Sequence, residues 1–224
     1  GNLNEYRQGN INKNFGFGIS VIQANKKSIL KHVISDKLSA PSITSIQSVS
    51  GAINFYESDV EISNSKFSNN LRGDDYINII RSEFLLSDNI FENTNGDSVD
   101  IDFSNGTIKN SLFNKSLNDA IDFSGSSVNL LNVKIMSAGD KAISAGEESE
   151  LFINDMLISN SKMGLVSKDR SKLFANNVHI SETDIAISAY IKKSEYGPAF
   201  IEGENIIINN SKLNYYKQSN SIMT

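Results

Sequence analysis

Three short segments place aspartate residues at matching positions, and these residues have the types and spacing that chemistry would need. The segments are GDSVDIDF, NDAIDFS and GDKAISAG, all within residues 96–146. Each opens with a turn residue and Asp and then alternates apolar and polar residues, as a half-buried strand does. Asp100 and Asp122 are 22 residues apart, and Ser144 follows after another 22. If these strands stack in adjacent layers, Asp100 and Asp122 lie about 4.8 Å apart.

Two carboxylates at that separation raise the pKa of one of them, share a proton, or hold a cation. Such pairs perform acid–base chemistry on glycosides or bind Ca²⁺. Asp100 and Asp122 are therefore candidate calcium ligands, and no other cofactor is required. The candidate substrate-binding residues share the outward face of these strands or border it; they are Asp100, Asp102, Ser124, Ser144, Lys168, Tyr190, Lys192 and Lys193. The simpler interpretation is structural, because Asp before a strand commonly forms a turn through its own side chain.

The same spacing continues in both directions along the chain. An outward column contains Ser20, Asn54, Asn78, Asp100, Asp122, Ser144, Val166 and Ser188. A second column, at the bends, contains Lys31, Asn64, Asp88, Asn110, Asn132, Asp155, Asn177 and Asn205. An apolar residue follows each member of the second column after three positions, starting at Ile34 and Phe67. Asn and Asp at the bends tolerate left-handed backbone and can form hydrogen bonds from coil to coil.

A period near 22 residues without helical patterns predicts a parallel β-helix. We expect an all-β, single-stranded, right-handed solenoid of about eight coils; the handedness follows the general rule for parallel crossovers. Residues 15–212 would form the solenoid. Residues 1–14 would be an N-terminal cap or linker, and residues 213–224 a C-terminal half-coil. Inward apolar residues such as Ile53, Ile77 and Val99 would form ladders in the core.

Two segments depart from the period. The first gap in the outward column is about a dozen residues too long, and DKLSAPSITSIQSV (36–49) is predicted to be a loop that leaves the stack. The second departure is IKKSEYGPA (191–199). Loops on a rigid scaffold frequently contribute to function. The two histidines, His32 and His179, are expected in surface or turn positions, which argues against a histidine metal site.

The composition excludes several classes of protein. A formal net charge of −5 argues against a nucleic-acid partner, which normally needs a basic stripe. No apolar run approaches the length of a membrane span. The chain has no Cys, so it has neither a disulfide framework nor a thiolate metal site. The N-terminal segment has no signal-peptide character, which suggests a mature fragment or an excised domain.

The coil pattern resembles the pectin-lyase-like superfamily of right-handed parallel β-helices. NGDSVDI (95–101), LNDAID (117–122) and DKAISAG (140–146) resemble three successive motif segments of polygalacturonase-type hydrolases. This resemblance implies that Asp97 and Asp119 match catalytic carboxylates. The family's general acid is replaced by Asn118 and its histidine by Lys141, which argues against a working polygalacturonase. The candidate catalytic set is therefore Asp97, Asp119, Asp122 and Lys141.

Several functions fit these residues. The first is an extracellular or cell-surface module that binds, and could process, a polysaccharide or surface glycan through its Asp-rich face. The second is a non-catalytic spacer or adhesin segment of a larger surface protein. The third is a calcium-dependent polysaccharide lyase with Asp100, Asp102 and Asp122 on the ion and Lys141 or Lys168 as base. Whether the protein is an enzyme stays open; if it is, we expect a polysaccharide lyase or a glycoside hydrolase. The oligomeric state also stays open.

Overall fold

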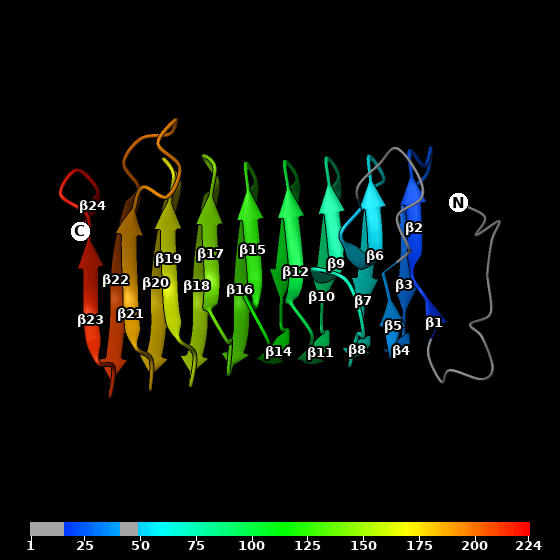
Figure 1. The fold of residues 1–224 in the computed structure, drawn as a ribbon, viewed down its shortest axis with the longest axis horizontal. Helices are drawn as coiled ribbons and strands as arrows, with labels where there is room; N and C mark the ends of the chain where they lie inside the picture. Colours follow the sequence, from blue (N-terminus) through cyan, green and yellow to red (C-terminus); the bar gives the residue numbers. More distant parts are fainter. Residues whose placement is uncertain (1–15, 41–48) are drawn as a thin grey trace.

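A computed structural model describes residues 16–40 and 49–224 and shows a single stack of β-coils. All strand pairs are parallel, and each strand pairs with its equivalents in the coils before and after it. Figure 1 shows the coils stacked along the long axis of the molecule, with the first and last coils at opposite ends. The described residues contain no helix, and accordingly none that is long and apolar enough to cross a membrane. The predicted all-β parallel β-helix is confirmed, and it is the architecture that the superfamily resemblance implies.

One face of the stack is a nine-stranded sheet, which supplies the outward column. Its strands are β2 (Ile19–Ile22), β6 (Gly51–Tyr56), β9 (Asp75–Ile80), β12 (Asp97–Asp102), β15 (Ile121–Ser124), β17 (Lys141–Gly146), β19 (Met163–Lys168), β21 (Ile185–Tyr190) and β23 (Leu213–Lys217). The pairing register joins Ser20 to Asn54 and continues residue by residue to Ser188, as the 22-residue spacing predicts.

The other face is a thirteen-stranded sheet that bends at the turn column. Its strands are β3 (Ser28–Lys31), β4 (Ile34–Asp36), β7 (Val60–Ser63), β8 (Lys66–Ser68), β10 (Glu83–Ser87), β11 (Ile90–Thr94), β13 (Asn105–Lys109), β14 (Leu112–Ser116), β16 (Ser127–Met136), β18 (Glu150–Ser159), β20 (Lys172–Ser181), β22 (Phe200–Asn209) and β24 (Ile222–Met223). A short pair, β1 (Gly16–Phe17) and β5 (Leu38–Ser39), lies beside the first coil.

The bends are formed by the predicted Asn and Asp residues. From Asn64 to Asn205 all seven members of the column have φ between 49° and 57°, the left-handed region that Asn and Asp tolerate. Neighbouring side chains form hydrogen bonds along the stack; Asn132 donates to Asn110 over 2.9 Å, and Asn110 donates to Asp88 over 3.2 Å. Seven of these bends keep the predicted register.

The first coil does not follow the predicted register. His32, with φ of 56°, occupies the bend that the spacing assigned to Lys31, since Lys31 pairs with Ser63 rather than with Asn64. Ser35 therefore pairs with Phe67, and Ile34 is exposed instead of entering the core. The cause is a bend one residue later in this coil than in the others. His32 and His179 are both exposed, as expected.

A second column of serines explains why the chain is rich in Ser. At another corner of the coils, the serine hydroxyl of one coil accepts a hydrogen bond from the backbone N–H of the serine in the coil before it. The donors and acceptors are Ser58 to Ser82, Ser82 to Ser104, Ser104 to Ser126, Ser126 to Ser149 and Ser149 to Ser171, at 2.8–3.1 Å. Because buried backbone donors need partners, these serines stabilise a corner where strand pairing is interrupted.

The core lies between the two sheets and consists of ladders of similar apolar side chains. Ile53, Ile77 and Val99 begin one ladder, and each is at most 1% exposed. Phe67, Phe91 and Phe113 form a buried stack, with ring centroids 5.1 Å and 4.8 Å apart. These ladders fix the spacing of the strands that present the outward column.

The two predicted loops have different outcomes. Of residues 36–49, Asp36 belongs to β4, and Leu38 and Ser39 form β5, so the start of this segment is strand and not loop. Residues 41–48 of that segment, and the proposed N-terminal cap at 1–14, lie outside the described residues. Residues 191–199 contain no strand and connect β21 to β22. Residues 213–224 form β23 and β24, which pair with β21 and β22.

Candidate functional site

The outward surface of β9, β12 and β15 gathers the carboxylates that the sequence singles out. Asp75 pairs with Asp97, and Asp100 pairs with Asp122 on the next coil. We use the name acidic face for Asp75, Asn78, Asp97, Asp100, Asp102, Asp119 and Asp122. The strict coil period explains its formation, since residues 22 apart must lie side by side on adjacent strands. The prediction that Asp100 and Asp122 lie side by side on adjacent coils is confirmed.

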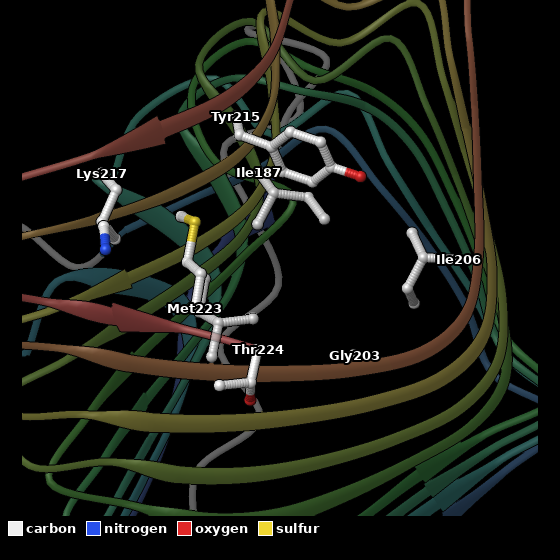
Figure 2. A pocket seen from close by; sticks show the side chains of 8 residues that line it. Ile187, Gly203, Ile206, Tyr215, Lys217, Met223 and Thr224 are labelled. Atoms are coloured by element: carbon white, nitrogen blue, oxygen red, sulfur yellow. The ribbon is translucent and has the colours of Figure 1, made fainter.

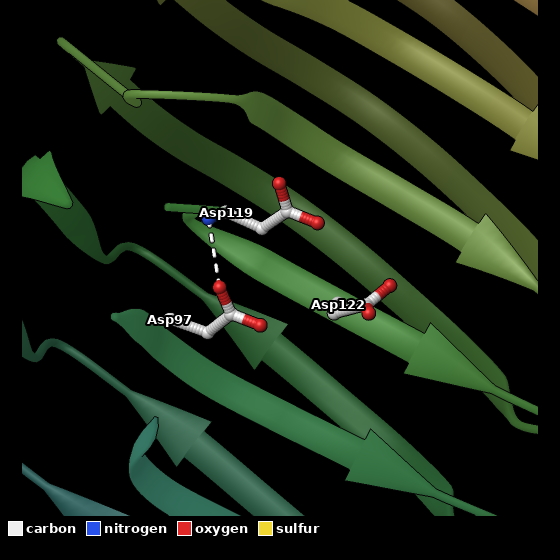
Figure 3. Close-up of side chains that lie close together, drawn as sticks. All are labelled: Asp97, Asp119 and Asp122. Atoms are coloured by element: carbon white, nitrogen blue, oxygen red, sulfur yellow. Dashed lines mark hydrogen bonds between the residues drawn. The ribbon is translucent and has the colours of Figure 1, made fainter. Parts of the chain in front are cut away.

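Three of these carboxylates form the centre of the face. One oxygen from each of Asp97, Asp119 and Asp122 lies within 4.8 Å of the other two (Figure 3). Asp97 and Asp119 are nearly buried, whereas Asp122 is half-buried. This trio differs from the predicted calcium pair, because Asp97 and Asp119 take the place of Asp100 beside Asp122. The spacing would allow the three oxygens to share a cation.

Asp97 and Asp119 also stabilise the coil through one oxygen each. Oδ1 of Asp97 accepts the backbone N–H of Asp119 over 2.8 Å and the side-chain amide of Asn118 over 2.7 Å. Oδ1 of Asp119 accepts the backbone N–H of Lys141 over 2.8 Å. The structural role that Asp has before a strand is thus present. For Asp97, the second oxygen makes no hydrogen bond to the described residues, and Figure 3 shows it on the side of Asp122.

Burial and crowding keep protons on several of these carboxyls. Burial, reinforced by Asp119, raises the pKa of Asp97 to about 8. Burial, reinforced by Asp74 and Asp102, raises the pKa of Asp75 to about 7. The pKa of Asp100 is raised well above its ordinary range by burial and by the charges of Asp75 and Asp102. Several carboxyls of the acidic face therefore have pKa values well above the ordinary range of aspartate.

Two lysines neutralise part of the charge. Nζ of Lys141 lies 3.3 Å from Oδ1 of Asp119 and also contacts Asp140, and Nζ of Lys168 lies 3.6 Å from Oδ1 of Asp122. Burial alone would lower the pKa of Lys141, but the carboxylates of Asp119 and Asp140 together raise it. A lysine with a raised pKa is a poor proton acceptor, so the geometry disfavours Lys141 as the base of a lyase.

The outward column is less accessible than alternation predicts. Asn78, Ser144, Val166 and Ser188 are at most 1% exposed although they face away from the core. The side chain of Lys168 lies over Gly146 of β17. A Cβ atom added to Gly146 would come within 2.7 Å of Lys168 Cε. Ser144, a predicted substrate-binding residue, is therefore not accessible in the structure. Alternation along one strand does not take into account long side chains such as that of Lys168, which lies over Gly146.

Four buried polar atoms on this surface have no hydrogen-bond partner among the described residues. They are Asp75 Oδ2, Asn78 Oδ1, Ser144 Oγ and Ser188 Oγ. Buried polar atoms are normally paired, by protein, water or ligand. Asn78 already donates to Asp100 over 3.1 Å and to Asp102 over 3.2 Å, so its free carbonyl oxygen is held in place beside the carboxylates. The acidic face thus retains unused acceptors.

The remaining predicted binding residues border the acidic face. Asp102 and Ser124 are partly exposed and pair with each other across β12 and β15. Tyr190 is half-buried, and its ring meets that of Tyr216 edge to face at 6.3 Å. Lys192 is exposed, whereas Nζ of Lys193 is paired with Glu147. Lys193 is therefore not a free cation for an acidic sugar.

Sequence reasoning missed Asp75 and undervalued Asn78. The segment GDDYINII (73–80) has the same turn-Asp-strand form as the three segments after it, so aligning it one coil earlier would have found Asp75. Asn78 was recognised as a column member but not as the amide that holds Asp100 and Asp102. Only the pairing of side chains between coils shows that role.

A cavity lies elsewhere in the structure and has a mostly apolar lining. A cavity of about 540 Å³ opens at the C-terminal end of the stack and is lined by Ile187, Ile201, Gly203, Ile206, Tyr215, Lys217, Met223 and Thr224 (Figure 2). Ile187 and Tyr215 belong to the inward ladder, so this cavity is the open end of the core. It is separate from the acidic face.

No family model matches the chain, and no curated protein matches it. Among solved structures, it is similar to two single-residue variants of the catalytic domain of a GH87 alpha-1,3-glucanase, each in complex with nigerose. The TM-scores are 0.48 and 0.47, with 11% and 10% sequence identity. The alignments cover 92% of this chain and 55% of each of those chains, so this chain spans about half their length. At this level of similarity, function has to be argued from the chain's own side chains.

Proposed function

We propose that the protein binds a neutral polysaccharide along the acidic face. The observation behind this proposal is the group formed by Asp97, Asp119 and Asp122, whose oxygens lie within 4.8 Å of one another on a partly exposed surface. Carboxylate oxygens accept hydrogen bonds from sugar hydroxyls, and Asp100, Asp102 and Asp122 are the partly exposed carboxylates of this face. Coils about 4.8 Å apart repeat these acceptors along the stack.

The charge balance favours a neutral glycan over an acidic one. Six aspartates contribute to the acidic face, and the two lysines that reach it, Lys141 and Lys168, are already paired with Asp119 and Asp122. A uronate polymer would find both of these lysines already paired, and its carboxylates would lie among the carboxyls of the face, which costs binding energy unless a cation intervenes. Calcium bridging through the central trio is the alternative, and it would turn the preference toward uronates.

Hydrolysis is the second candidate, and the protonation states favour it. Asp97 retains a proton at neutral pH because its pKa is about 8, while Asp122 lies beside the positive charge of Lys168. A proton donor next to a carboxylate is the pair that glycosidases use. Their oxygens lie within 4.8 Å, well below the roughly 6.5–9.5 Å gap between the carboxyl groups of inverting enzymes. Cleavage would therefore retain the anomeric configuration, with Asp97 as acid and Asp122 as nucleophile.

A polysaccharide partner suits an extracellular or cell-surface setting, which we include in the proposal. The competing proposal is a structural spacer, in which the aspartates only stabilise the coils. The spacer requires every polar group of the acidic face to serve the fold. The second oxygen of Asp97 has no such role among the described residues, and this favours a ligand.

The test is binding of soluble neutral glucans, mannans and xylans, and of polygalacturonate with and without calcium, to the protein and to Asp97→Asn/Asp122→Asn. We expect saturable binding of a neutral polymer that falls at least tenfold in the double variant. Glu202→Gln on β22, an exposed position of the other sheet, is the matched control and should bind normally. Binding only of polygalacturonate with calcium would favour the bridged alternative, and no binding of any polymer would favour the spacer.

Hydrolysis is tested separately by reducing-end release and by the anomer formed first. Activity that retains configuration and disappears in Asp97→Asn would support the catalytic candidate. Binding without cleavage would leave the protein as a binding module.

A further inference from the structure

A corner of the stack next to the acidic face contains an unusual aromatic residue. The turns that follow the first seven strands of the nine-stranded sheet each have a residue with positive φ, and successive coils place Glu57, Arg81, Phe103 and Gly125 there. Phe103 has φ of 50° and is 56% exposed. Every other non-glycine residue of positive φ among the described residues is polar. A bulky apolar side chain at such a position costs backbone energy and exposes hydrophobic surface.

The next coil is shaped to accommodate this ring. A Cβ atom at Gly125 would come within 2.6 Å of Phe103 Cδ1 and 2.8 Å of Cε1. Glycine at position 125 therefore leaves the space that the ring occupies. Gly125 itself has φ of 60°, which suits glycine, so the exposed phenylalanine with positive φ is the choice that the backbone disfavours. The fold alone does not require phenylalanine there, since Glu57 and Arg81 occupy the same corner in earlier coils.

A guanidinium group borders the ring on the preceding coil. The centre of the Arg81 guanidinium lies 5.6 Å from the ring centroid of Phe103 and 6.0 Å from that of Tyr56. Its Nη1 donates to the Tyr56 hydroxyl over 3.1 Å, which fixes its orientation. Arg81 makes no ion pair with a carboxylate of the described residues, so its other N–H groups remain available. An aromatic ring and a fixed set of donors thus lie together at one rim.

This rim is continuous with the acidic face. Phe103 directly follows Asp102, and the backbone N–H of Arg81 donates to the carbonyl of Asp102 over 2.9 Å. A ligand that contacts Asp100 and Asp102 would reach the ring by extending a short distance across the same strand. Exposed aromatic rings stack on the apolar faces of pyranoses, while arginine donates to their hydroxyl oxygens.

We propose that Phe103 and Arg81 form a stacking subsite for one pyranose residue of a neutral glycan. This inference rests on the proposed function and adds a subsite to it. The ring contributes contact area and Arg81 contributes donors, which complement the acceptors of the acidic face. Removing the ring should therefore reduce affinity without changing the stability of the fold.

Phe103→Gly is the decisive variant, because glycine adopts positive φ without strain and cannot stack. We expect its thermal stability to equal or exceed that of the wild type, while affinity for the neutral polymer falls about tenfold. Phe103→Leu should lose a similar factor, whereas Phe103→Tyr retains the ring and should bind normally. Phe152→Leu on β18, an exposed phenylalanine of the other sheet at 37%, is the matched control and should bind normally.

The outcomes separate this subsite from the proposed function. If the wild type binds a neutral polymer and Phe103→Gly binds it equally well, the subsite is wrong and the proposed function stands. Equal losses in Phe152→Leu and Phe103→Gly would place the glycan elsewhere and overturn the subsite. If the wild type binds no neutral polymer, the proposed function and the subsite are both overturned.

Discussion

At the scale of single residues, the acidic face combines a structural and a chemical use of the same side chain. Oδ1 of Asp97 accepts the backbone N–H of Asp119, and its other oxygen makes no hydrogen bond to the described residues. The hydrogen bonds hold the carboxyl in a buried place, and burial raises its pKa to about 8. The requirement of the coil thus produces a group whose proton equilibrium lies near neutral pH.

Asp97 should make the stability of the protein depend on pH. Its pKa is about 8 when folded and 3.8 ordinarily, so between these values only the folded state retains the proton. The stabilisation is complete below about pH 4 and is lost as pH rises through about 8. We expect the melting temperature to fall between about pH 5 and pH 8.5, and to fall less in Asp97→Asn, which retains the Oδ1 acceptor.

Thermal unfolding across this pH range provides the measurement, and at pH 8.5 the variant should melt roughly 2–6 °C higher than the wild type. Asp75, with a pKa of about 7, leaves a residual slope in the variant. Asp184→Asn, an exposed carboxylate paired with Lys212, is the control and should retain the full slope. Parallel curves for Asp97→Asn and the wild type would contradict a proton held by Asp97.

At the scale of elements, the aromatic stack of β8, β11 and β14 should dominate the stability of the N-terminal coils. Phe91 is fully buried between Phe67 and Phe113. Phe91→Ala should cost about 3–5 kcal/mol, because it removes a large side chain and leaves a cavity. Chemical denaturation measures the loss. Phe152→Ala provides the comparison. The ring centroids of Phe152 and Phe174 lie 5.2 Å apart, but both side chains are partly exposed. This substitution should therefore lower the free energy of unfolding by less than about 2 kcal/mol.

The connection at 191–199 is held by one buried aspartate. Oδ1 of Asp169 accepts the backbone N–H groups of Lys192 and Lys193 over 2.6 and 2.7 Å, and Lys193 also pairs with Glu147. Asp169→Ala should therefore loosen this segment and leave the coils intact. We expect hydrogen exchange of residues 191–198 to accelerate at least tenfold, with unchanged exchange in β15 and β17. Protection equal to the wild type would mean that the Glu147 pair is sufficient.

The sequence predicts the strands and their register, because each depends on a repeated local pattern. Asp100 opposite Asp122, and the bends from Asn64 to Asn205, follow from spacing alone. The prediction fails in the first coil, where the bend lies at His32 instead of Lys31. The longer gap between the first two coils is the one sign of this shift in the sequence. Long side chains are the other limit. Alternation assigns Ser144 to solvent, whereas it is fully buried. Spacing does not contain the direction of a long side chain such as Lys168, which lies over Gly146 of the same strand.

At the scale of the whole molecule, each strand pairs only with its equivalents in the adjacent coils, so the stack should tolerate the loss of one complete coil. Glu150 pairs with Lys172 and Met163 with Ile185, both 22 residues apart. Deleting residues 150–171 should let β20 take the place of β18 on β16, and β21 the place of β19 on β17. Because every inward ladder then continues, we expect a folded protein with a cooperative thermal transition.

Deleting residues 150–160 is the matched control, since half a coil places each later strand on the wrong face. Circular dichroism and thermal unfolding distinguish the two variants; only the complete-coil deletion should retain β-structure and a cooperative transition. Its melting temperature should fall, because it also loses Asp169 and the pair between Lys168 and Asp122. If the complete-coil deletion unfolds as the half-coil deletion does, the stability of the protein depends on contacts beyond neighbouring coils, and the stack is not modular.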